Sequence, residues 1–317
     1  MACFLHLNVG MYQRTVGDTI GFSGIGLHTG LPVSVRILPS GEGTGISFVR
    51  RDIPGSPVIK AKCKNVVSTS FATTLGVDGV TVSTVEHLLA ALYGMGVDNA
   101  LIEVDGPEVP IMDGSAVPFV EMIEKVGLSR LDSPRRYIVI RRPLKVSENE
   151  KYIYLMPPGD ADGEDLLSID YTIDFAHSYL NRQSFAFSLS PGSFKREIVG
   201  ARTFGFLKDV EMLKKNGLAL GGSLKNAVVI GDDDILNEEG LRYTDEFVRH
   251  KVLDLIGDLA LLGMPLIGRI KAYRSGHALN QSLVTKVLKT PRRWKMLEFV
   301  EAESATVPVL SEELVTA

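Results

Sequence analysis

One histidine and two aspartates recur at four-residue intervals in the segment DEFVRHKVLDLIGDLALLG. His250, Asp254 and Asp258 stand at i, i+4 and i+8, so a helix would place their side chains in one narrow stripe. Apolar residues fill most other positions, which predicts a helix over 244–263 that is buried on more than one side. A buried imidazole and two buried carboxylates are costly without partners. Two explanations are open: His250 and Asp254 bind a metal ion from successive turns, or the stripe faces solvent and Lys251 pairs with the carboxylates.

A second pair, Glu86 and His87, lies near the start of a helix predicted over 84–93. A catalytic zinc site needs imidazole ligands and a carboxylate base beside the metal, and this pair supplies one of each. The alternative for Glu86 is a capping box, because residues 83–86 (STVE) have the required spacing. The alternative for His87 is a hydrogen-bonded core histidine. Two histidines and one aspartate would leave the fourth position of a tetrahedral ion open, as in catalytic sites.

A third candidate, His277, follows a serine and a glycine where a predicted strand meets a predicted helix. A glycine at such a junction lets backbone and ligand approach closely. Asp258 lies one turn beyond Asp254 and is a candidate to orient and charge His277. The alternative for His277 is an exposed histidine at a helix N-terminus.

The remaining histidines carry weaker signals. His28 in SGIGLHTGL could bind a metal ion, but its place in a turn between strands favours a structural role. The glycine spacing of that turn does not fit a dinucleotide-binding motif. His6 and His177 carry no signal alone, and the acidic run 232–234 is expected to be solvated.

Hydrophobic patterning, glycine and proline define the elements that must position these residues. Strands are predicted at 14–22, 30–38, 98–104, 137–146, 151–156, 167–175, 226–231 and 265–273. Helices are predicted at 84–93, 115–126, 193–202, 244–263 and 277–289. Each half of the chain runs through strands, a helix, a strand, a loop and a second helix, which predicts a duplicated α+β unit with one site between its copies. The charged, turn-rich stretch 127–136 is the expected domain boundary, and the chain from Ser304 is expected to be loosely ordered.

Composition limits the classes of function. The chain has 317 residues, which favours about two domains. Its net charge of 34 − 38 = −4 argues against nucleic acid or an anionic membrane as the main partner, although a local basic pocket is compatible with it. Only two cysteines, Cys3 and Cys63, occur, so a disulfide framework or a multi-cysteine zinc cluster is excluded and a reducing cytoplasm is expected. We expect no transmembrane segment and no signal peptide, and Met11 is an alternative start.

Five segments together resemble one known family: STVEHLLAAL, DNALIEVDGPEVPIMDGSAVPFV, ARTFGF, LNEEGLRYTDEFVRHKVLDLIGDL and YRSGHALN. From about Gln13 to about Trp294 the chain is similar to the zinc-dependent UDP-3-O-acyl-N-acetylglucosamine deacetylases of lipid A synthesis. The VEH, HKxxD and SGHALN motifs in combination are highly specific. The resemblance implies an α+β fold of two similar domains, each a β-sheet packed on two helices (a β-α-α-β sandwich) with a small insert. The resemblance implies an N-terminal domain over residues 1–130 and a C-terminal domain over residues 135–300, which has an insert near 205–231. Residues 304–317 would form a tail.

The resemblance also implies a single Zn²⁺ ion at the domain junction, with three ligands: His87, His250 and Asp254. It implies that Glu86 is the general base and that His277, supported by Asp258, stabilises developing charge and protonates the leaving amine. Thr203 matches the residue that helps to polarise the acetyl carbonyl and hold the oxyanion. These roles would hydrolyse the N-acetyl group of UDP-3-O-acyl-N-acetylglucosamine to acetate and UDP-3-O-acyl-glucosamine, the committed step of lipid A biosynthesis in a Gram-negative bacterium.

Substrate contacts are implied in the same way. Phe204 and the insert that follows it would shape an apolar passage for the acyl chain, and Lys251 would meet the sugar and diphosphate. Further matches to substrate-contact positions are Lys151, Phe175, Asp209 and Arg274. Arg274 departs from the family pattern, in which lysine is common at this position. The positive charge is the same, but the guanidinium group has a different geometry from an ammonium group.

Two other classes of protein compete with this interpretation. A zinc amidase or peptidase acting on another substrate would share the metal site, and activity on a short acetylated sugar would favour it. A carbohydrate- or lipid-binding protein with a structural zinc ion is the second, but Glu86 and His277 beside an open coordination position argue against it. We expect a monomeric enzyme whose partner is an acylated UDP-amino-sugar rather than nucleic acid.

Overall fold

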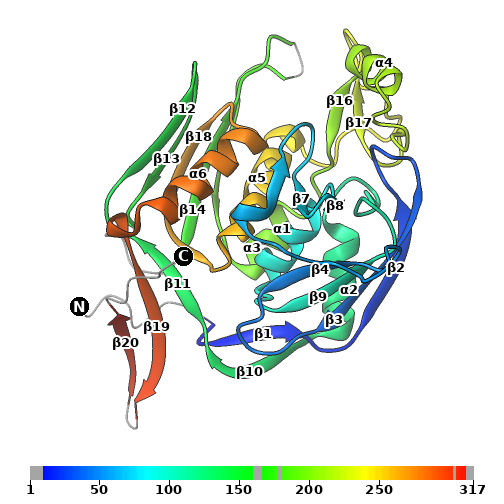
Figure 1. Cartoon of the computed structure of the whole chain (residues 1–317). Coiled ribbons are helices and arrows are strands. Elements are labelled where there is room, and N and C mark those ends of the chain that lie inside the picture. Colours follow the sequence, from blue (N-terminus) through cyan, green and yellow to red (C-terminus); the bar gives the residue numbers. More distant parts are fainter. Residues whose placement is uncertain (1–9, 160–165, 178–179, 303–304, 312–317) are drawn as a thin grey trace.

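The computed structural model describes residues 10–159, 166–177, 180–302 and 305–311. Over these residues the fold is mixed α+β, with two larger sheets and a group of helices between them (Figure 1). None of the helices among these residues is long and apolar enough to cross a membrane.

The sheet from the first half of the chain has five strands in the order β2-β3-β9-β4-β5. Their bounds are β2 Ile20–Ile25, β3 Pro32–Pro39, β9 Ala100–Val104, β4 Ile46–Arg50 and β5 Val58–Lys60. Alternate residues of β3 point into the core, where Val33, Val35 and Ile37 are buried, as the period of two in LPVSVRILP predicts. A separate three-stranded sheet contains β6 Val66–Ser68, β7 Thr74–Val77 and β8 Val80–Val82.

The larger sheet from the second half has eight strands. Its main path runs β12 Leu144–Glu148, β13 Lys151–Met156, β18 Leu266–Tyr273, β11 Arg136–Ile140, β19 Trp294–Ala302 and β20 Ala305–Ser311. Strand β14 Leu167–Ile173 pairs with β18 and with β15 Gln183–Ser188. Two smaller pairs are β1 Tyr12–Val16 with β10 Leu128–Pro134, and β16 Phe204–Phe206 with β17 Val228–Ile230.

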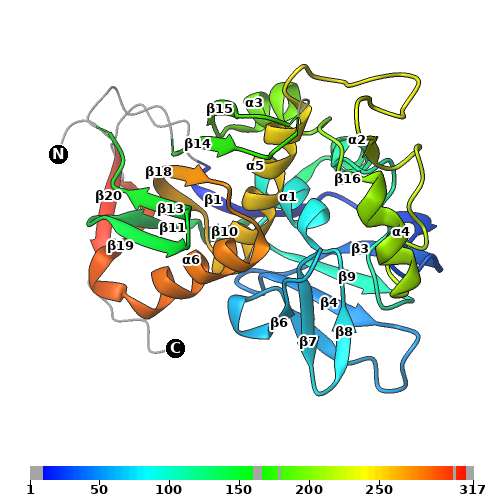
Figure 2. The same cartoon turned by 90° about the horizontal axis from the view of Figure 1, so that it is seen from above.

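Helices α1 and α5 lie side by side between the two larger sheets (Figures 1 and 2). The helices are α1 Glu86–Met95, α2 Val117–Val126, α3 Pro191–Glu197, α4 Leu207–Lys215, α5 Glu246–Leu259 and α6 His277–Lys289, and a 3₁₀ turn, Ala260–Leu262, extends α5. Nearly every residue of α1 and α5 is buried, as expected for helices that are apolar on most of their circumference. Gly257 permits the close approach, because a Cβ atom there would overlap the backbone carbonyl of Glu86.

Several elements predicted from the sequence differ from the structure, and two predicted strands are each interrupted by a turn. The strand predicted over 14–22 is two strands, β1 and β2, because the chain turns between them, where the Asp18 side chain accepts the N–H of Thr19. The strand predicted over 137–146 is also two, β11 and β12, with Pro143 between them. Most of the expected boundary 127–136 is strand β10.

Other differences concern helices and the C-terminal region. The helix predicted over 193–202 begins earlier, after the capping serine Ser190, and ends at Glu197. Helix α4 was not predicted. The tail expected from Ser304 instead contains β20, which pairs with β19, while residues 312–317 lie outside the described part of the chain.

We predict that Gly257→Ala destabilises the fold. The new methyl group must push α1 away from α5, and overpacking of this kind costs roughly 2 kcal/mol. The higher helix propensity of alanine, about 1 kcal/mol, acts in the opposite direction and offsets only part of this cost. Chemical denaturation measures the free energy of unfolding.

Gly21→Ala is the control for Gly257→Ala, because no described atom lies within 4 Å of its Cβ position. Equal stability of the two variants would contradict the proposed packing constraint.

Candidate metal centre

Helices α1 and α5 bring together three side chains that could hold one metal ion: His87, His250 and Asp254. One potential ligand atom from each lies within 4.8 Å of the others. Asp254 Oδ1 lies 3.6 Å from His87 Nε2 and 3.4 Å from His250 Nε2, and the two imidazole rings are perpendicular. All three side chains are buried, so the solvent-exposed alternative for the α5 stripe is wrong.

The protonation states around this cluster suit a divalent cation. Burial lowers the pKa of His250 to about 3, which leaves a neutral imidazole. Burial alone would raise the pKa of Asp254, but Lys251 Nζ, 2.6 Å from Asp254 Oδ2, and His250 hold it well below its usual value. Since Lys251 occupies Oδ2, Oδ1 is the oxygen that faces both histidines.

The hydrogen bond of His250 also fits a metal ion. His250 Nδ1 lies 3.0 Å from the Ala201 carbonyl oxygen and can donate to it, which leaves Nε2 as the lone-pair nitrogen. His87 Nδ1 is buried and has no hydrogen-bond partner among the described residues. His87 therefore lacks the contacts of a satisfied core histidine, the alternative that its sequence context allowed.

An acid–base pair lies beside the cluster. His277 Nε2, at the start of α6, is 3.7 Å from Glu86 Oε1 and 3.9 Å from Asp254 Oδ2. His277 Nδ1 donates to Asp258 Oδ2 at 2.9 Å. The side chain of His277 is only 11% exposed, so it is not the solvated helix-terminal histidine of the alternative interpretation.

The pKa values of Glu86 and His277 are both raised above their usual values. Burial raises the pKa of Glu86, and nearby His277 only partly opposes this. Burial by itself would lower the pKa of His277, but Asp258 and Glu86 outweigh it and raise the pKa to about 9. A carboxylate of raised basicity thus faces an imidazolium ion.

The capping box suggested by residues 83–86 does not form. The α1 N-terminus has no side-chain cap, and Glu86 Oε2 instead accepts the backbone N–H of Thr73 at 3.0 Å. The Ser83 hydroxyl pairs with Thr74. Glu86 is therefore held by the loop before β7 and not by its own helix.

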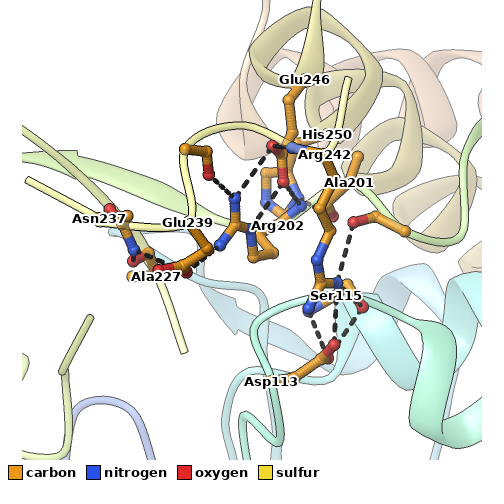
Figure 3. A network of polar contacts seen from close by, with 12 residues as sticks. Asp113, Ser115, Ala201, Arg202, Ala227, Asn237, Glu239, Arg242, Glu246 and His250 are labelled. Carbon is orange, nitrogen blue, oxygen red and sulfur yellow. Dashed lines mark hydrogen bonds and ion pairs between the residues drawn. The ribbon is translucent and has the colours of Figure 1, made fainter. Parts of the chain in front are cut away.

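A buried ion-pair network holds the backbone behind His250 (Figure 3). The Glu246 carboxylate, in the first turn of α5, accepts hydrogen bonds from the Arg202 backbone and guanidinium and from the Arg242 backbone. Because Arg202 follows Ala201, this network fixes the carbonyl group that orients the His250 ring. Neither Arg202 nor Glu246 was identified from the sequence, since nothing in their local spacing marks them.

The cluster opens into a cavity of about 380 Å³. Six further predicted residues line it: Lys151, Phe175, Thr203, Phe204, Lys251 and Arg274. Asp258 lies behind His277, and Asp209 on α4 is not among the lining residues. Three non-glycine residues on the cavity wall, Phe71, Thr84 and Arg274, have positive φ, a cluster of backbone strain of the kind found at functional sites.

The remaining histidines lie outside the metal-ligand cluster. His28 is anchored through its backbone N–H, which donates to Glu108. His177 Nε2 lies 3.0 Å from the Gly231 carbonyl oxygen, and His6 is outside the described residues.

Two buried histidines and an ionised carboxylate beside an acid–base pair are typical of the class of metal-dependent hydrolases. Within this class, the sequence matches one particular family. The model of the UDP-3-O-acyl N-acetylglycosamine deacetylase family matches residues 13–289. The chain belongs to this family.

Curated relatives of similar length support the same assignment. Proteins named UDP-3-O-acyl-N-acetylglucosamine deacetylase from Syntrophus aciditrophicus (strain SB) and Geobacter sp. (strain M21) are 47% and 48% identical to the chain. These matches cover 93% and 91% of this chain, and 91% and 93% of the relatives. The protein of that name from Myxococcus xanthus (strain DK1622) is 49% identical over 90% of this chain and 89% of its own length.

We predict that Asp254→Ala loses the metal ion. The substitution removes the oxygen that faces both histidines, and Lys251 then carries an uncompensated positive charge beside the site. Elemental analysis after dialysis measures the metal content, with circular dichroism as the control for folding. Stoichiometric metal in folded Asp254→Ala protein would contradict the ligand assignment.

We predict that Glu246→Gln weakens metal binding about tenfold, the lower end of the usual effect of losing a group that orients a ligand. The amide cannot accept the full set of Arg202 and Arg242 hydrogen bonds, so the Ala201 carbonyl is no longer fixed. Competition with a chromogenic chelator measures the affinity.

Glu239→Gln is the matched control for Glu246→Gln. Its carboxylate pairs with the same arginine at 2.7 Å, but its side chain is 58% exposed, so we expect wild-type affinity. Equal affinities of the two variants would contradict the role of the buried network.

Proposed function

We propose that the chain hydrolyses the N-acetyl group of UDP-3-O-acyl-N-acetylglucosamine, which gives acetate and UDP-3-O-acyl-glucosamine in lipid A biosynthesis. The observation that carries the proposal is the meeting of the ligand cluster and the acid–base pair at one cavity, in a chain of this family.

We further propose that the ion is Zn²⁺, held by His87, His250 and Asp254. This donor set suits zinc, because nitrogen and carboxylate oxygen are common zinc ligands and three protein ligands leave a position open. When bound, the ion supplies Lewis-acid activation of the attacking water and of the amide carbonyl.

Glu86 is proposed as the general base. Its Oε2 is held by the Thr73 N–H, so Oε1 is the oxygen that can accept a proton from the attacking water. The raised pKa of this buried carboxyl makes it a stronger base than a solvated one.

His277 is proposed as the general acid. Its Nδ1–H is engaged by Asp258, so the proton available to substrate is the one on Nε2. An amine leaves poorly as an anion, and transfer of this proton to the nitrogen completes cleavage of the C–N bond. The imidazolium charge and the Thr203 hydroxyl on the cavity wall would stabilise the developing oxyanion.

The substrate contacts follow from the chemistry of the cavity wall. Lys151, Lys251 and Arg274 would provide positive charge for the sugar diphosphate, although Lys251 is also paired with Asp254. Phe175 and Phe204 form an edge-to-face pair and would contact the acyl chain. Contact with Asp209 would require substrate to extend beyond the cavity towards α4.

We also propose the domain division expected from the sequence. Residues 1–130 would form one domain around the five-stranded sheet, with α1 and α2, and residues 135–300 a second around the eight-stranded sheet, with α5 and α6. The three-stranded sheet and the β16–α4–β17 unit would be their inserts. We propose that the enzyme acts as a monomer in the cytoplasm.

We predict that the zinc-supplemented protein releases acetate from the acylated UDP-sugar and that Glu86→Ala loses nearly all of this activity, because the base is removed. His277→Ala should keep its zinc while turnover collapses. Acetate release and zinc content are measured on the same samples. No release from the wild type would refute the proposed reaction, and equal release from a short acetylated sugar would favour a broader amidase.

We predict that Asp258→Asn moves the alkaline limb of the kcat/KM profile to lower pH. With a pKa of about 9, His277 keeps its proton below that pH and loses it above, so the acid fails as pH rises. Removal of the Asp258 charge takes away the largest influence that raises this pKa. Asp233→Asn, in the exposed acidic run, is the control, and an unshifted limb in Asp258→Asn would contradict the assignment.

A further inference from the structure

The loop before β7 contacts both members of the acid–base pair. Thr73 in this loop is 1% exposed and contacts three polar side chains of the site. Its backbone N–H donates to Glu86 Oε2 at 3.0 Å, its hydroxyl donates to Asp258 Oδ1 at 2.6 Å, and the same hydroxyl lies 3.3 Å from His277 Nδ1. Thr73 is thus in hydrogen-bond contact with both Glu86 and the Asp258–His277 pair.

We propose that Thr73 is a positioning residue that sets the general base Glu86 and the general acid His277 in the correct mutual geometry. The proposal rests on the proposed deacetylase function, because that function assigns the acid and base roles. Thr73 itself transfers no proton. It acts through Glu86 and Asp258.

The backbone contact selects which Glu86 oxygen is available. With Oε2 fixed by the Thr73 N–H, Oε1 is the oxygen that faces His277 Nε2 at 3.7 Å. Terminal carboxylate torsions are broad and weakly restrained by sterics, so a hydrogen bond is needed to hold one orientation.

The Thr73 hydroxyl donates the third hydrogen bond to the Asp258 carboxylate. Asp258 Oδ2 accepts from His277 Nδ1 and from Asn280 Nδ2 at 2.8 Å, and Oδ1 accepts from Thr73. A buried carboxylate oxygen without a donor is costly, so loss of the hydroxyl would favour rotation of Asp258 and a tilt of the His277 ring.

The loop is itself fastened to the start of α1. Val85 N–H donates to the Thr73 carbonyl oxygen, and the Thr74 hydroxyl pairs with Ser83. Two residues before Thr73, Phe71 has a φ of 62° and lines the cavity. Thr73 therefore keeps a fixed place relative to Glu86, while its hydroxyl reaches Asp258, 185 residues later in the chain.

The experiment compares Thr73→Val, which keeps the shape and backbone N–H, with Thr73→Ser, which keeps the hydroxyl. In zinc-loaded protein we expect Thr73→Val to lower kcat roughly 10- to 100-fold, the usual effect of losing a hydrogen bond to a charged group, with KM and zinc content unchanged. Thr73→Ser should retain most of the wild-type kcat. Thr44→Val is the control, because its hydroxyl donates to the Gly41 carbonyl oxygen and has no contact with the acid–base pair.

A spectroscopic readout separates positioning from general destabilisation. The Nδ1–H proton resonance of His277 should shift in Thr73→Val and stay in place in Thr73→Ser and Thr44→Val. In an Asp258→Asn background, Thr73→Val should lower kcat much less than in the wild type, because the two residues act together. Should Thr73→Val not fold, Thr73→Ala takes its place in each comparison.

Wild-type kcat in Thr73→Val, or equal losses in Thr73→Val and Thr73→Ser, would overturn the proposal. If the wild-type protein releases no acetate, the proposed function fails. The His277 resonance still reports whether Thr73 sets the geometry of the pair, so the two failures are distinguishable.

Discussion

The close approach of α1 and α5 is the constraint on which the rest of the site depends. His87 belongs to one helix, and His250 and Asp254 belong to the other, so neither helix alone presents three ligands. The two backbones can meet only because position 257 has no side chain. Burial of the apolar faces of both helices provides the driving force for this contact.

Burial also removes charged side chains from water, which costs free energy, and the surrounding polar groups offset this cost. Ionised groups such as Asp254 and Lys251 are stable in the interior only because they pair closely. Asp258 is likewise satisfied by three donors, and Glu246 by two arginines. The same contacts that make buried charge tolerable also fix its orientation, which catalysis requires.

Much of the local structure could be predicted from the sequence. The helix expected at 277–289 matches α6, and the stripe of His250, Asp254 and Asp258 lies on α5 as expected. Predictions failed where tertiary contacts override local pattern. The helix expected to continue to residue 202 ends at Glu197, because the following segment supplies the Ala201 carbonyl to His250 and the Thr203 N–H to Gly114. The contacts of Thr73 with Asp258 have no sequence signal, since 185 residues separate the partners.

The sequence by itself determined the residue types and the helical periodicity that place His250 and Asp254 together, since both lie within a few turns of one helix. Its motifs also identified the family, which the comparisons bear out. Only the tertiary structure decided how Glu86 is held, which Asp254 oxygen faces the histidines, and that Arg202 and Glu246 stand behind His250. These features depend on contacts between distant segments, whose geometry is set by packing of the whole core and not by any local pattern.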